Sequence, residues 1–395
     1  MTARDVLITG IGLVSSLGEG ADAHWRVLSA PGAAPVLDAE GYAPYTVHPL
    51  PEIDWTAQIP RRGDQRQMGT WQRLGTYAAG LALDDAGARG DEALCGAMDM
   101  VVAAGGGERD VAVDEAILAE SLARQDHGVL LNDKLTTELR PTLFLAQLSN
   151  LLAGNISIVH KVTGSSRTFM GEEGAGVSAV ETAAARIRTR QADRALVGAA
   201  FQTEHPDMLL GYELGGYLHR EAWRPVWQRA GRAGGGVVTG SGAAFLVLEA
   251  REEAERRGRT AYAAMGPVLS GRARRDEGSF PDAVSGMLRS LALPAAPTMA
   301  LSGASGAHAA TAVERDALRG ADRLAIRGFA TLTGHLKEAQ FPFAVALAAL
   351  AIRHGAAYPP FDAGFEAPLD GAPQCALVTA IGYHRFEGIG LVTRA

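Results

Sequence analysis

The stretch 163–202 constrains the fold more than any other part of this sequence. Residues 167–170 predict a short strand, and the three glycines within 171–176 predict a tight turn after it. The small and apolar residues of 177–190 recur at i, i+3 and i+4, which predicts a helix, and the apolar run 196–201 predicts a buried strand. The residue at such a bend projects over the helix N-terminus, where free N–H groups and the helix dipole favour an anion. The stretch therefore predicts a strand–turn–helix with the geometry that usually carries a nucleophile.

The composition is that of an ordinary globular protein, with 47% apolar and 21% charged residues among 395. This length allows two or three average domains, yet large α/β folds often form one unit of this size. The net charge of −7 argues against a nucleic-acid-binding surface, and no 18-residue apolar window suggests a membrane span or a signal peptide. Two cysteines provide no disulfide framework, so we expect a protein of the reducing cytoplasm. The sequence predicts no cofactor and no metal site.

Residues 5–14 form a continuous apolar run, as expected for a strand that is buried on both faces. Gly10 and Gly12 match part of a dinucleotide-binding fingerprint, but the third glycine and its helix do not follow in register. Residues 98–107 predict another buried strand, which ends in three glycines, and 108–125 then predicts an amphipathic helix.

The segment 141–158 is nearly free of charge over the length of a helix. A helix that is apolar all round must be buried or paired. The sequence leaves open whether this predicted helix belongs to the core or to a subunit interface.

The predicted elbow carries a resemblance to a known family. The pattern Thr-Gly-x-x-x-Thr, which begins at Thr163 and is followed by a fixed step to Gly176, resembles the nucleophile elbow of the β-ketoacyl synthases. These are the condensing enzymes of fatty acid and polyketide assembly. The family's catalytic Cys falls three residues before that last glycine, where this chain has Glu173, preceded by Glu172.

The resemblance also covers the N-terminal quarter of the chain and returns at 240–249, where Ser241 replaces the Glu that is usual in the family. The two cysteines, Cys95 and Cys375, lie in apolar surroundings far from the elbow. We expect both to be buried structural thiols. The resemblance thus implies the scaffold of a condensing enzyme without its nucleophile.

Two further catalytic regions of the family can be placed on the sequence. Gly303 falls where the first catalytic His belongs, if Glu314 is the Glu that ends the family's His-containing loop. His308 is then a bystander. His335 is retained in a stretch that resembles the family's Lys-Ser-x-x-Gly-His motif, with Ala330 in place of the Lys. One member of the Cys–His–His set survives, and the resemblance implies no catalytic residue in this chain.

The loop 382–387 stands where the family has a glycine-rich gating loop. Tyr383 aligns with the gating Phe, whereas His384 and Phe386 are bulkier than the residues they replace. Glycines in such a loop allow the backbone to move and to approach the thioester. The gating loop therefore departs from the family as well.

The resemblance implies an α/β fold, specifically a thiolase-like five-layer αβαβα fold built of two similar halves. We place these halves at 1–250 and 251–395 and regard them as one fused ketosynthase-like domain.

The departures together suggest a chain length factor, a catalytically degenerate relative that pairs with an active, Cys-containing ketosynthase in type II polyketide systems. Such a subunit shapes the acyl tunnel and controls chain length. On this interpretation the chain is no enzyme on its own but a non-catalytic subunit of an acyltransferase heterodimer, which meets acyl carrier protein mainly through the partner. The segment 102–110 looks most like the branch that makes polyene-type, highly reduced chains. We expect no nucleic-acid and no membrane partner.

In dimers of this family, the helix after Gly107 faces the partner's tunnel and the segment 141–158 lies at the interface. The resemblance therefore implies a set of tunnel or interface residues: Val111, Ala112, Val113, Asp114, Ile117, Phe144, Gln147, Leu148 and Leu151. Asp114 is the odd member, because an unpaired buried carboxylate is unfavourable. It is alternatively an exposed helix carboxylate.

Two other functions stay open at this stage. Glu173 and His335 could form the acid–base pair of a thiolase-fold thioester hydrolase or decarboxylase, although a carboxylate at 173 repels a substrate carboxylate. The chain could also be a homodimeric structural or regulatory relic.

Overall fold

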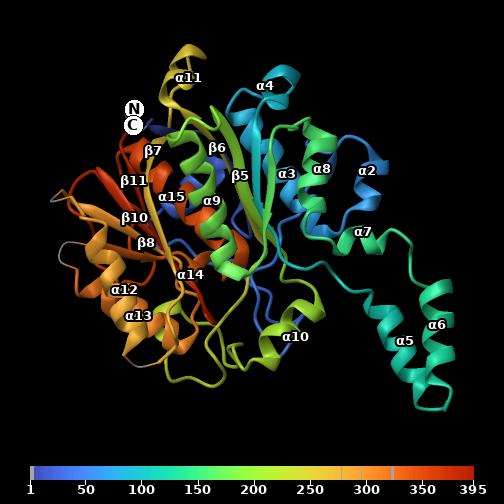
Figure 1. The fold of residues 1–395 in the computed structure, drawn as a ribbon. Helices are drawn as coiled ribbons and strands as arrows, with labels where there is room; N and C mark the ends of the chain where they lie inside the picture. The colour runs from blue at the N-terminus through green and yellow to red at the C-terminus, as the bar shows by residue number, and fades with distance from the viewer. Residues whose placement is uncertain (1–3, 277, 295, 322–323) are drawn as a thin grey trace.

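The computed structural model describes residues 4–276, 278–294, 296–321 and 324–395, and a mixed sheet of eleven strands runs through its centre (Figure 1). The strands are β1 (Val6–Ser15), β2 (Gly18–Glu19), β3 (Asp99–Ala103), β4 (Ser166–Phe169), β5 (Arg194–Phe201), β6 (Gly242–Ala250), β7 (Ala263–Gly271), β8 (Thr298–Ser302), β9 (Leu324–Gly328), β10 (Cys375–Ile381) and β11 (Glu387–Thr393). The helices of the N-terminal part are α1 (Ala21–Leu28), α2 (Arg62–Gln67), α3 (Thr70–Asp85), α4 (Glu92–Gly96), α5 (Val111–Ser121), α6 (His127–Thr137), α7 (Leu143–Gln147), α8 (Leu151–His160), α9 (Glu172–Arg188) and α10 (Pro206–Leu214). Those that follow are α11 (Arg251–Arg256), α12 (Ser279–Ser290), α13 (His308–Arg319), α14 (Ala330–Thr333) and α15 (Gln340–His354), and the short 3-10 turns are η1 (Trp55–Ala57), η2 (Val226–Gln228) and η3 (Lys337–Ala339).

The strands fall into two sets with the same order of pairing. In the first set, β4 and β5 flank β3 in parallel, and β6 and β1 continue the sheet antiparallel. In the second set, β9 and β10 flank β8 in parallel, and β11 and β7 continue the sheet antiparallel. A short antiparallel contact between β1 and β7 joins the two sets. The expected boundary after residue 250 falls where β6 ends and α11 begins, and it stays a prediction that each set forms one half of the fold.

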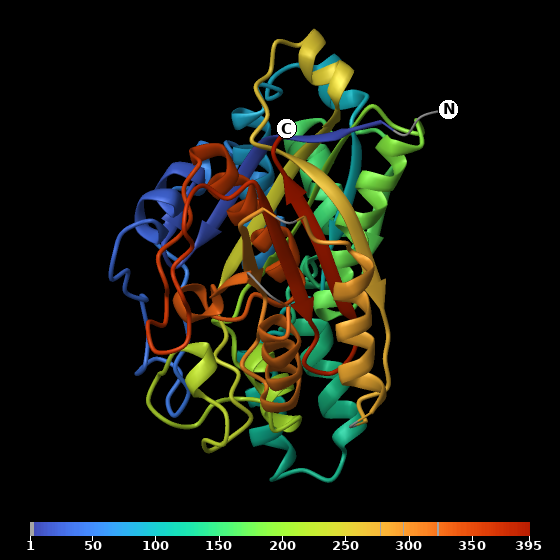
Figure 2. The ribbon, with the colours of Figure 1, turned by 90° about the vertical axis from the view of Figure 1, so that its left-hand side faces the viewer.

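Helices form three layers around these strands. α9 and α15 pack on each other and on strands of both sets. α3 and α8 contact the first set, and α12 and α13 cover the second set (Figures 1 and 2). The expected α/β class, with alternating layers of helix and sheet, is confirmed.

α15 is the centre of the core. Every residue from Gln340 to Ile352 is buried, and most of them are alanine, valine, leucine or phenylalanine. A helix that is apolar on all sides is stable only when other elements surround it, as the two strand sets do here. Among the described helices, α15 included, none is both long enough and apolar enough to cross a membrane.

The expectation of one helix over 141–158 is wrong, because the structure has two helices, α7 and α8. Leu148 between them has an extended backbone, with φ −84° and ψ 120°. The side chains of Gln72 and Trp71 on α3 donate to carbonyl groups of the preceding turn, at 3.3 Å each. A helix can end inside an apolar run when distant side chains satisfy its last carbonyl groups.

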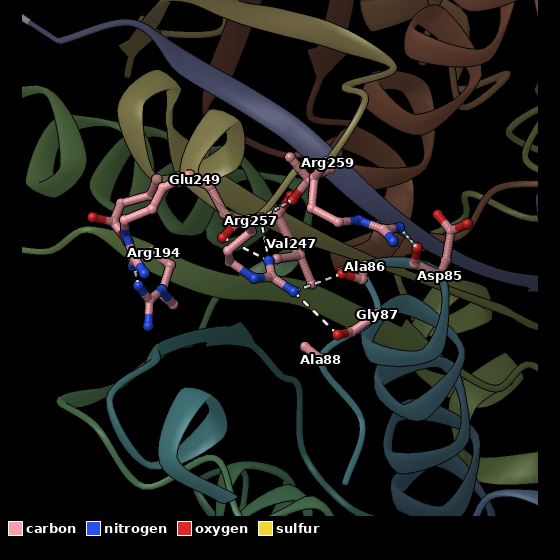
Figure 3. Close-up of polar contacts among 12 residues, drawn as sticks. Asp85, Ala86, Gly87, Ala88, Arg194, Val247, Glu249, Arg257 and Arg259 are labelled. Atoms are coloured by element: carbon pink, nitrogen blue, oxygen red, sulfur yellow. Dashed lines mark hydrogen bonds and ion pairs between the residues drawn. The ribbon is translucent and has the colours of Figure 1, made fainter. Parts of the chain in front are cut away.

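A buried ion pair ties α3 to the strands at the junction of the two sets (Figure 3). Arg257 donates to the two carboxylate oxygens of Glu249 at 2.8 and 2.7 Å. Its other terminal nitrogen donates to the carbonyl oxygens of Ala86 and Gly87, at 2.8 and 3.1 Å, just after α3. Thr9 on β1 donates to the same carboxylate at 2.7 Å. The guanidinium therefore satisfies a fully buried carboxylate and a helix C-terminus together.

Candidate active site

The predicted elbow forms between β4 and α9, with a difference in where the helix begins. α9 starts at Glu172, so Gly174 and Gly176 lie inside the helix and not in a turn. The bend itself consists of Gly171, with φ 123°, and Glu172, with φ 50°. A side chain at positive φ is strained, and such strain concentrates at functional sites.

Glu173 lies beside the retained histidine, His335. Oε1 of Glu173 and Nε2 of His335 are 3.0 Å apart, and both side chains are buried, with 1% and 0% exposed. The two atoms form no hydrogen bond, since neither ring nitrogen of His335 has a hydrogen-bond partner among the described residues. A carboxylate and an imidazole in contact away from water can exchange a proton. The fold thus brings together two residues that lie far apart in the sequence.

Tyr383 covers this site from the loop 382–387. Its hydroxyl donates to Oε1 of Glu172 at 3.0 Å, and its N–H donates to Oε1 of Glu173 at 3.4 Å. The rings of Tyr212 and Tyr217 pack on it, with centroids 5.1 and 4.6 Å away. Burial, assisted by the charge of Glu172, raises the pKa of Tyr383, so its hydroxyl stays a donor.

The rest of the loop fits this closed arrangement. Phe386, with φ 66°, packs over Gly174, where any side chain would collide with the ring. The guanidinium groups of Arg272 and Arg385 lie 5.4 and 5.5 Å from the ring centroid of Phe386, within the range of cation–π attraction. His384 is exposed.

The other two degenerate positions offer no polar side chain. The N–H of Gly303 donates to the carbonyl oxygen of Thr379 at 3.1 Å, and a Cβ atom at 303 would overlap that oxygen. Ala330 is fully buried at the start of α14. His308 is half-buried at the start of α13.

Glu314 lies behind Gly303 and is also fully buried. It accepts hydrogen bonds from the hydroxyl of Ser302, at 2.6 Å, and from the hydroxyl of Thr379. Burial raises the pKa of Glu314 to about 7, and the charge of Glu173 adds to the rise.

The sequence does not reveal a charged pair that begins two residues after His335. Nζ of Lys337 and Oε1 of Glu338 lie 3.6 Å apart, and Glu338 is 2% exposed. The carboxylates of Glu338, Glu172 and Glu173 raise the pKa of Lys337. The available signal was two adjacent ionisable residues directly before the apolar stretch that forms α15.

A second contact that the sequence does not reveal involves Ser241. Its hydroxyl donates to Oε2 of Glu204 at 2.7 Å and accepts from the N–H of Thr203 at 3.0 Å. The N–H of Leu50 donates to the same Glu204 oxygen at 2.7 Å. The position at which ketosynthases have Glu therefore still contacts a carboxylate, which the loop after β5 supplies.

Both cysteines are buried and free. Burial raises the pKa of Cys375 to about 11 and also raises the pKa of Cys95. Neither thiol is a ready nucleophile at neutral pH. Within the described ranges, no three His, Cys, Asp or Glu side chains gather as metal ligands would.

The expected tunnel residues lie mostly on α5, which forms with α6 a hairpin that stands away from the layered body (Figure 1). Val113 is buried, whereas Asp114 is partly exposed and forms an ion pair with Arg109, with Nε and Oδ2 2.6 Å apart. That hydrogen bond lowers the pKa of Asp114. The exposed or half-buried positions of the set are Val111, Ala112, Ile117, Phe144, Gln147, Leu148 and Leu151.

Large apolar side chains are exposed on and next to this hairpin. We call them the apolar hairpin surface, and its members are Leu118, Leu122, Val129, Leu131, Leu135, Phe144 and Leu145. The exposed fraction reaches 91% at Leu122 and 65% at Phe144. Apolar side chains gathered in this way usually mark an interaction site.

Comparison with known proteins relates this geometry to one family. The model of the "Beta-ketoacyl synthase, N-terminal domain" matches residues 3–254. The 3-oxoacyl-[acyl-carrier-protein] synthase 2 of Vibrio harveyi is 26% identical over 273 residues, which make up 67% of this chain and 62% of that protein. The match therefore spans less than two thirds of the relative's length.

Two solved structures show the same fold over the whole chain. The ishigamide ketosynthase/chain length factor has a TM-score of 0.78 and 21% identity, with 100% of both chains covered. A type II polyketide synthase acyl-carrier protein in complex with its ketosynthase bound to the hexaketide gives a TM-score of 0.73 and 15% identity, again over 100% of both chains. At these identities the likeness shows the fold alone, and it confirms the expected thiolase-like ketosynthase fold.

The relatives correct one expectation. The Vibrio harveyi protein and those of Vibrio cholerae and Rhizobium meliloti are all named as 3-oxoacyl-[acyl-carrier-protein] synthases, which are enzymes. The expectation that this chain is no enzyme on its own, but a non-catalytic subunit, is therefore wrong. It depended on the missing thiol, on Gly303 and Ala330 in place of the family's His and Lys, and on the altered loop 382–387, whereas the site keeps Glu173 and His335 in contact.

Proposed function

The chain belongs to the β-ketoacyl synthase family, and from that premise we propose that it is the chain length factor of a type II polyketide synthase. In this role it pairs with a ketosynthase that has the catalytic Cys, and it shapes the tunnel that receives the growing acyl chain. The observation that carries the proposal is Glu173, which is buried at the elbow position where the family has its Cys. A ketosynthase/chain length factor among the structures of the same fold supports it.

The chemistry of condensation supports this division of labour. Carbon–carbon bond formation needs a thiolate to hold the acyl chain and two imidazoles to polarise the malonyl thioester and stabilise the enolate. This chain offers a carboxylate at Glu173, no side chain at Gly303 and a single imidazole at His335. We therefore assign the acyl-bearing thiol to the partner, which leaves Glu173 and His335 available for proton transfer.

The apolar hairpin surface supports the pairing. Obligate interfaces bury about 2,000 Å² or more and are rich in apolar side chains. Leu118, Leu122 and Phe144 lie largely in water in the single chain, at 67%, 91% and 65% exposed. We propose that a Cys-containing homologue covers them, and that the pair is a heterodimer.

The side chains of α5 support a role in chain length. Val111, Ala112, Val113 and Ile117 include no aromatic ring, so they leave room at the end of a tunnel for an extended product. Asp114 is already paired with Arg109 and does not need a tunnel-facing partner.

The proposal also names a product class, a carrier protein and a cellular compartment. The segment 102–110 favours polyene-type, highly reduced chains. The structure of an acyl-carrier protein in complex with its ketosynthase suggests that the carrier binds here too, mainly through the partner. The two free, buried cysteines suit a cytoplasmic protein.

A second candidate function uses the contact between Glu173 and His335, 3.0 Å apart. In a thioester hydrolase, Glu173 takes the proton of the attacking water and His335 donates to the thioester oxygen. Decarboxylation suits the site less, because Glu173 repels a malonyl carboxylate. Tyr383 has to leave Glu172 before any thioester can enter.

Reconstitution with a Cys-containing ketosynthase and acyl carrier protein tests the two candidates. A chain length factor forms a stable 1:1 complex, and elongation requires both subunits. A hydrolase cleaves acyl-carrier thioesters as a purified single chain, and Glu173→Gln abolishes that cleavage. Elongation by the partner alone, with unchanged product lengths, contradicts the first proposal.

A further inference from the structure

We infer that the acidic side chains of the hairpin formed by α5 and α6 select a partner whose facing surface is rich in Lys or Arg, and that they oppose pairing with a second copy of this chain. The inference deepens the proposed function and rests on it, since it gives the charge of the surface that covers the apolar hairpin surface. The hairpin stands away from the layered body, so its side chains are accessible to another subunit (Figure 1).

The hairpin carries more than half of the net charge of the chain. Residues 109–138 include seven Asp or Glu and three Lys or Arg, a net charge of −4, whereas the whole chain of 395 residues has a net charge of −7. A concentration of one sign of charge attracts a surface of opposite charge and repels a surface of like charge. The hairpin therefore presents a negative field to any approaching subunit.

The three basic side chains of the hairpin are already engaged in ion pairs. The pairs are Arg109 with Asp114, Arg124 with Asp126, and Lys134 with both Glu120 and Glu138. Glu115 and Asp133 are exposed, and neither has an ion-pair partner among the residues that the structure describes. These two carboxylates can therefore pair with cations of another chain.

Glu115 and Asp133 lie beside exposed apolar side chains of the hairpin. On α5, the residues Glu115, Leu118 and Leu122 follow one another at spacings of three and four, which places them on one face. On α6, Val129 and Asp133 are four residues apart and are neighbours in the same way. Leu118, Leu122 and Val129 are 67%, 91% and 54% exposed. A subunit that covers these apolar side chains must therefore also meet the two carboxylates.

The facing surface has to supply the opposite charge. Interfaces have an apolar centre and a polar rim, and like charges brought together across the rim oppose binding. A two-fold dimer presents the same patch on both subunits, so a dimer of this chain through the hairpin would bring two net charges of −4 into one interface. A different chain with Lys or Arg beside its apolar patch meets no such repulsion. The charge therefore favours a heterodimer, in which Glu115 and Asp133 help to choose the partner.

Association kinetics with the Cys-containing ketosynthase, measured by surface plasmon resonance, test the inference. The variant Glu115→Lys/Asp133→Lys reverses both charges at exposed positions, so it should fold normally. Its association rate constant should be about ten-fold lower than that of the wild type at about 0.1 M salt, because electrostatic attraction speeds the encounter of two subunits. At about 1 M salt, where charges act over about 3 Å and not over about 10 Å, the two rate constants should agree within about two-fold.

Two further variants make the test specific to the hairpin. Glu255→Lys/Asp370→Lys changes the net charge by the same amount at exposed positions outside the hairpin, and it should associate as fast as the wild type within about two-fold. Glu115→Gln/Asp133→Asn removes both charges without reversing them and should give an intermediate rate constant. The inference is overturned if Glu115→Lys/Asp133→Lys associates as fast as the control, or if salt does not slow the wild type. If circular dichroism shows that the charge-reversed variant does not fold, the neutral variant decides in its place.

The same samples separate this inference from the proposed function. Gel filtration reports whether the chain pairs with the ketosynthase, and sedimentation of the chain alone reports whether it pairs with itself. A complex whose formation depends neither on salt nor on the two carboxylates refutes this inference and leaves the proposed function intact. The absence of a complex at any salt concentration refutes the proposed function, and the inference with it. A wild-type homodimer that Phe144→Asp disrupts would make a second copy the occupant of the surface and would overturn the inference.

Discussion

The main-chain oxygen of Thr379 occupies the space that any side chain at Gly303 would need. The two residues are also joined by a hydrogen bond from the N–H of Gly303, at 3.1 Å. The position of the family's first catalytic His is therefore closed by backbone, and a single substitution cannot restore the imidazole. The missing histidine reflects a change in the shape of the site as well as in its chemistry.

Gly303→Ala should destabilise the protein by about 1–3 kcal/mol, because the added methyl group overpacks a buried site. Urea unfolding followed by circular dichroism measures the loss. Gly211→Ala on α10 is the control, since nothing lies within 4 Å of a Cβ atom there and alanine favours a helix. Equal stability of Gly303→Ala and the wild type would show that the backbone at Thr379 can move away from the added methyl group at little cost in free energy.

Glu173→Gln should leave at least half of the elongation rate of the reconstituted heterodimer, because the acyl chain is held by the partner's thiol. Replacing the partner's Cys should abolish elongation. Intact-mass spectrometry during turnover provides the second measurement, and it should find acyl adducts on the partner only. An adduct on this chain would contradict the assignment.

Phe144→Asp should prevent co-purification with the ketosynthase, because it buries a charge in the apolar interface. The side chain is 65% exposed in the single chain, so the variant should fold normally. Val36→Asp, at a position 48% exposed outside the apolar hairpin surface, is the control and should still pair. A Phe144→Asp heterodimer of normal stability would place the interface elsewhere. Leu148→Asp and Leu151→Asp should act in the same way as Phe144→Asp.

Ala112→Phe should shift the products to shorter chains while the first condensation keeps its normal rate. A ring at the end of the tunnel forces a growing chain either to leave or to overpack the site, at about 1–3 kcal/mol. Product lengths are measured by liquid chromatography and mass spectrometry. Ser121→Phe, on the opposite face of α5, is the control. Unchanged product lengths with Ala112→Phe, in an intact complex, would show that α5 does not set the chain length. Val113 is buried in this chain, so Val113→Phe would also disturb the packing of α5 and is a less direct test of its role in chain length.

The buried carboxyl of Glu314 should make stability depend on pH. Its pKa rises from 4.5 to about 7 on folding, so the folded state binds more protons than the unfolded state between those values. The resulting stabilisation is fully present below pH 4.5 and is lost as pH rises to about 7, and it amounts to about 3 kcal/mol.

Glu314→Gln keeps the shape of the group and removes its titration. The difference in unfolding free energy between wild type and variant should therefore change by about 3 kcal/mol from pH 4.5 to pH 7.5. Glu115→Gln, at an exposed position on α5, is the control. A constant difference across this range would mean that Glu314 is ionised throughout.

Local patterns in the sequence predict the elbow but not its register. Glycines and the 3.6-residue period identify the bend and α9, whereas the helix begins at Glu172, inside the predicted turn. The break at Leu148 has no local signal, because Gln72 and Trp71 on α3 satisfy the carbonyl groups of Leu145 and Ala146 just before it. Patterns within one segment cannot report a contact that another segment supplies.

The contacts within the site cannot be predicted from local patterns either, because the tertiary fold creates them. The resemblance locates Glu173 and His335 one at a time, and the packing of α9 against η3 brings them within 3.0 Å. The hydrogen bond from Tyr383 to Glu172 and the placement of Glu338 against Gly105 follow only from that packing. The sequence predicts which residues have changed, and the structure adds which of them now touch.

The ion pair of Glu249 and Arg257 spans residue 250, where the first strand set ends along the chain. The carboxylate lies on β6, the last strand of the first set, and the guanidinium precedes the second set in the chain. Division of the chain at residue 250 would therefore leave Glu249 with Thr9 as a donor but without its counter-charge. A piece that ends at residue 250 retains a buried anion, and the remaining piece exposes a cation that had closed α3. The two strand sets have the same pairing order, yet this ion pair connects them. Exchange of one half between related subunits would therefore have to keep both Glu249 and Arg257.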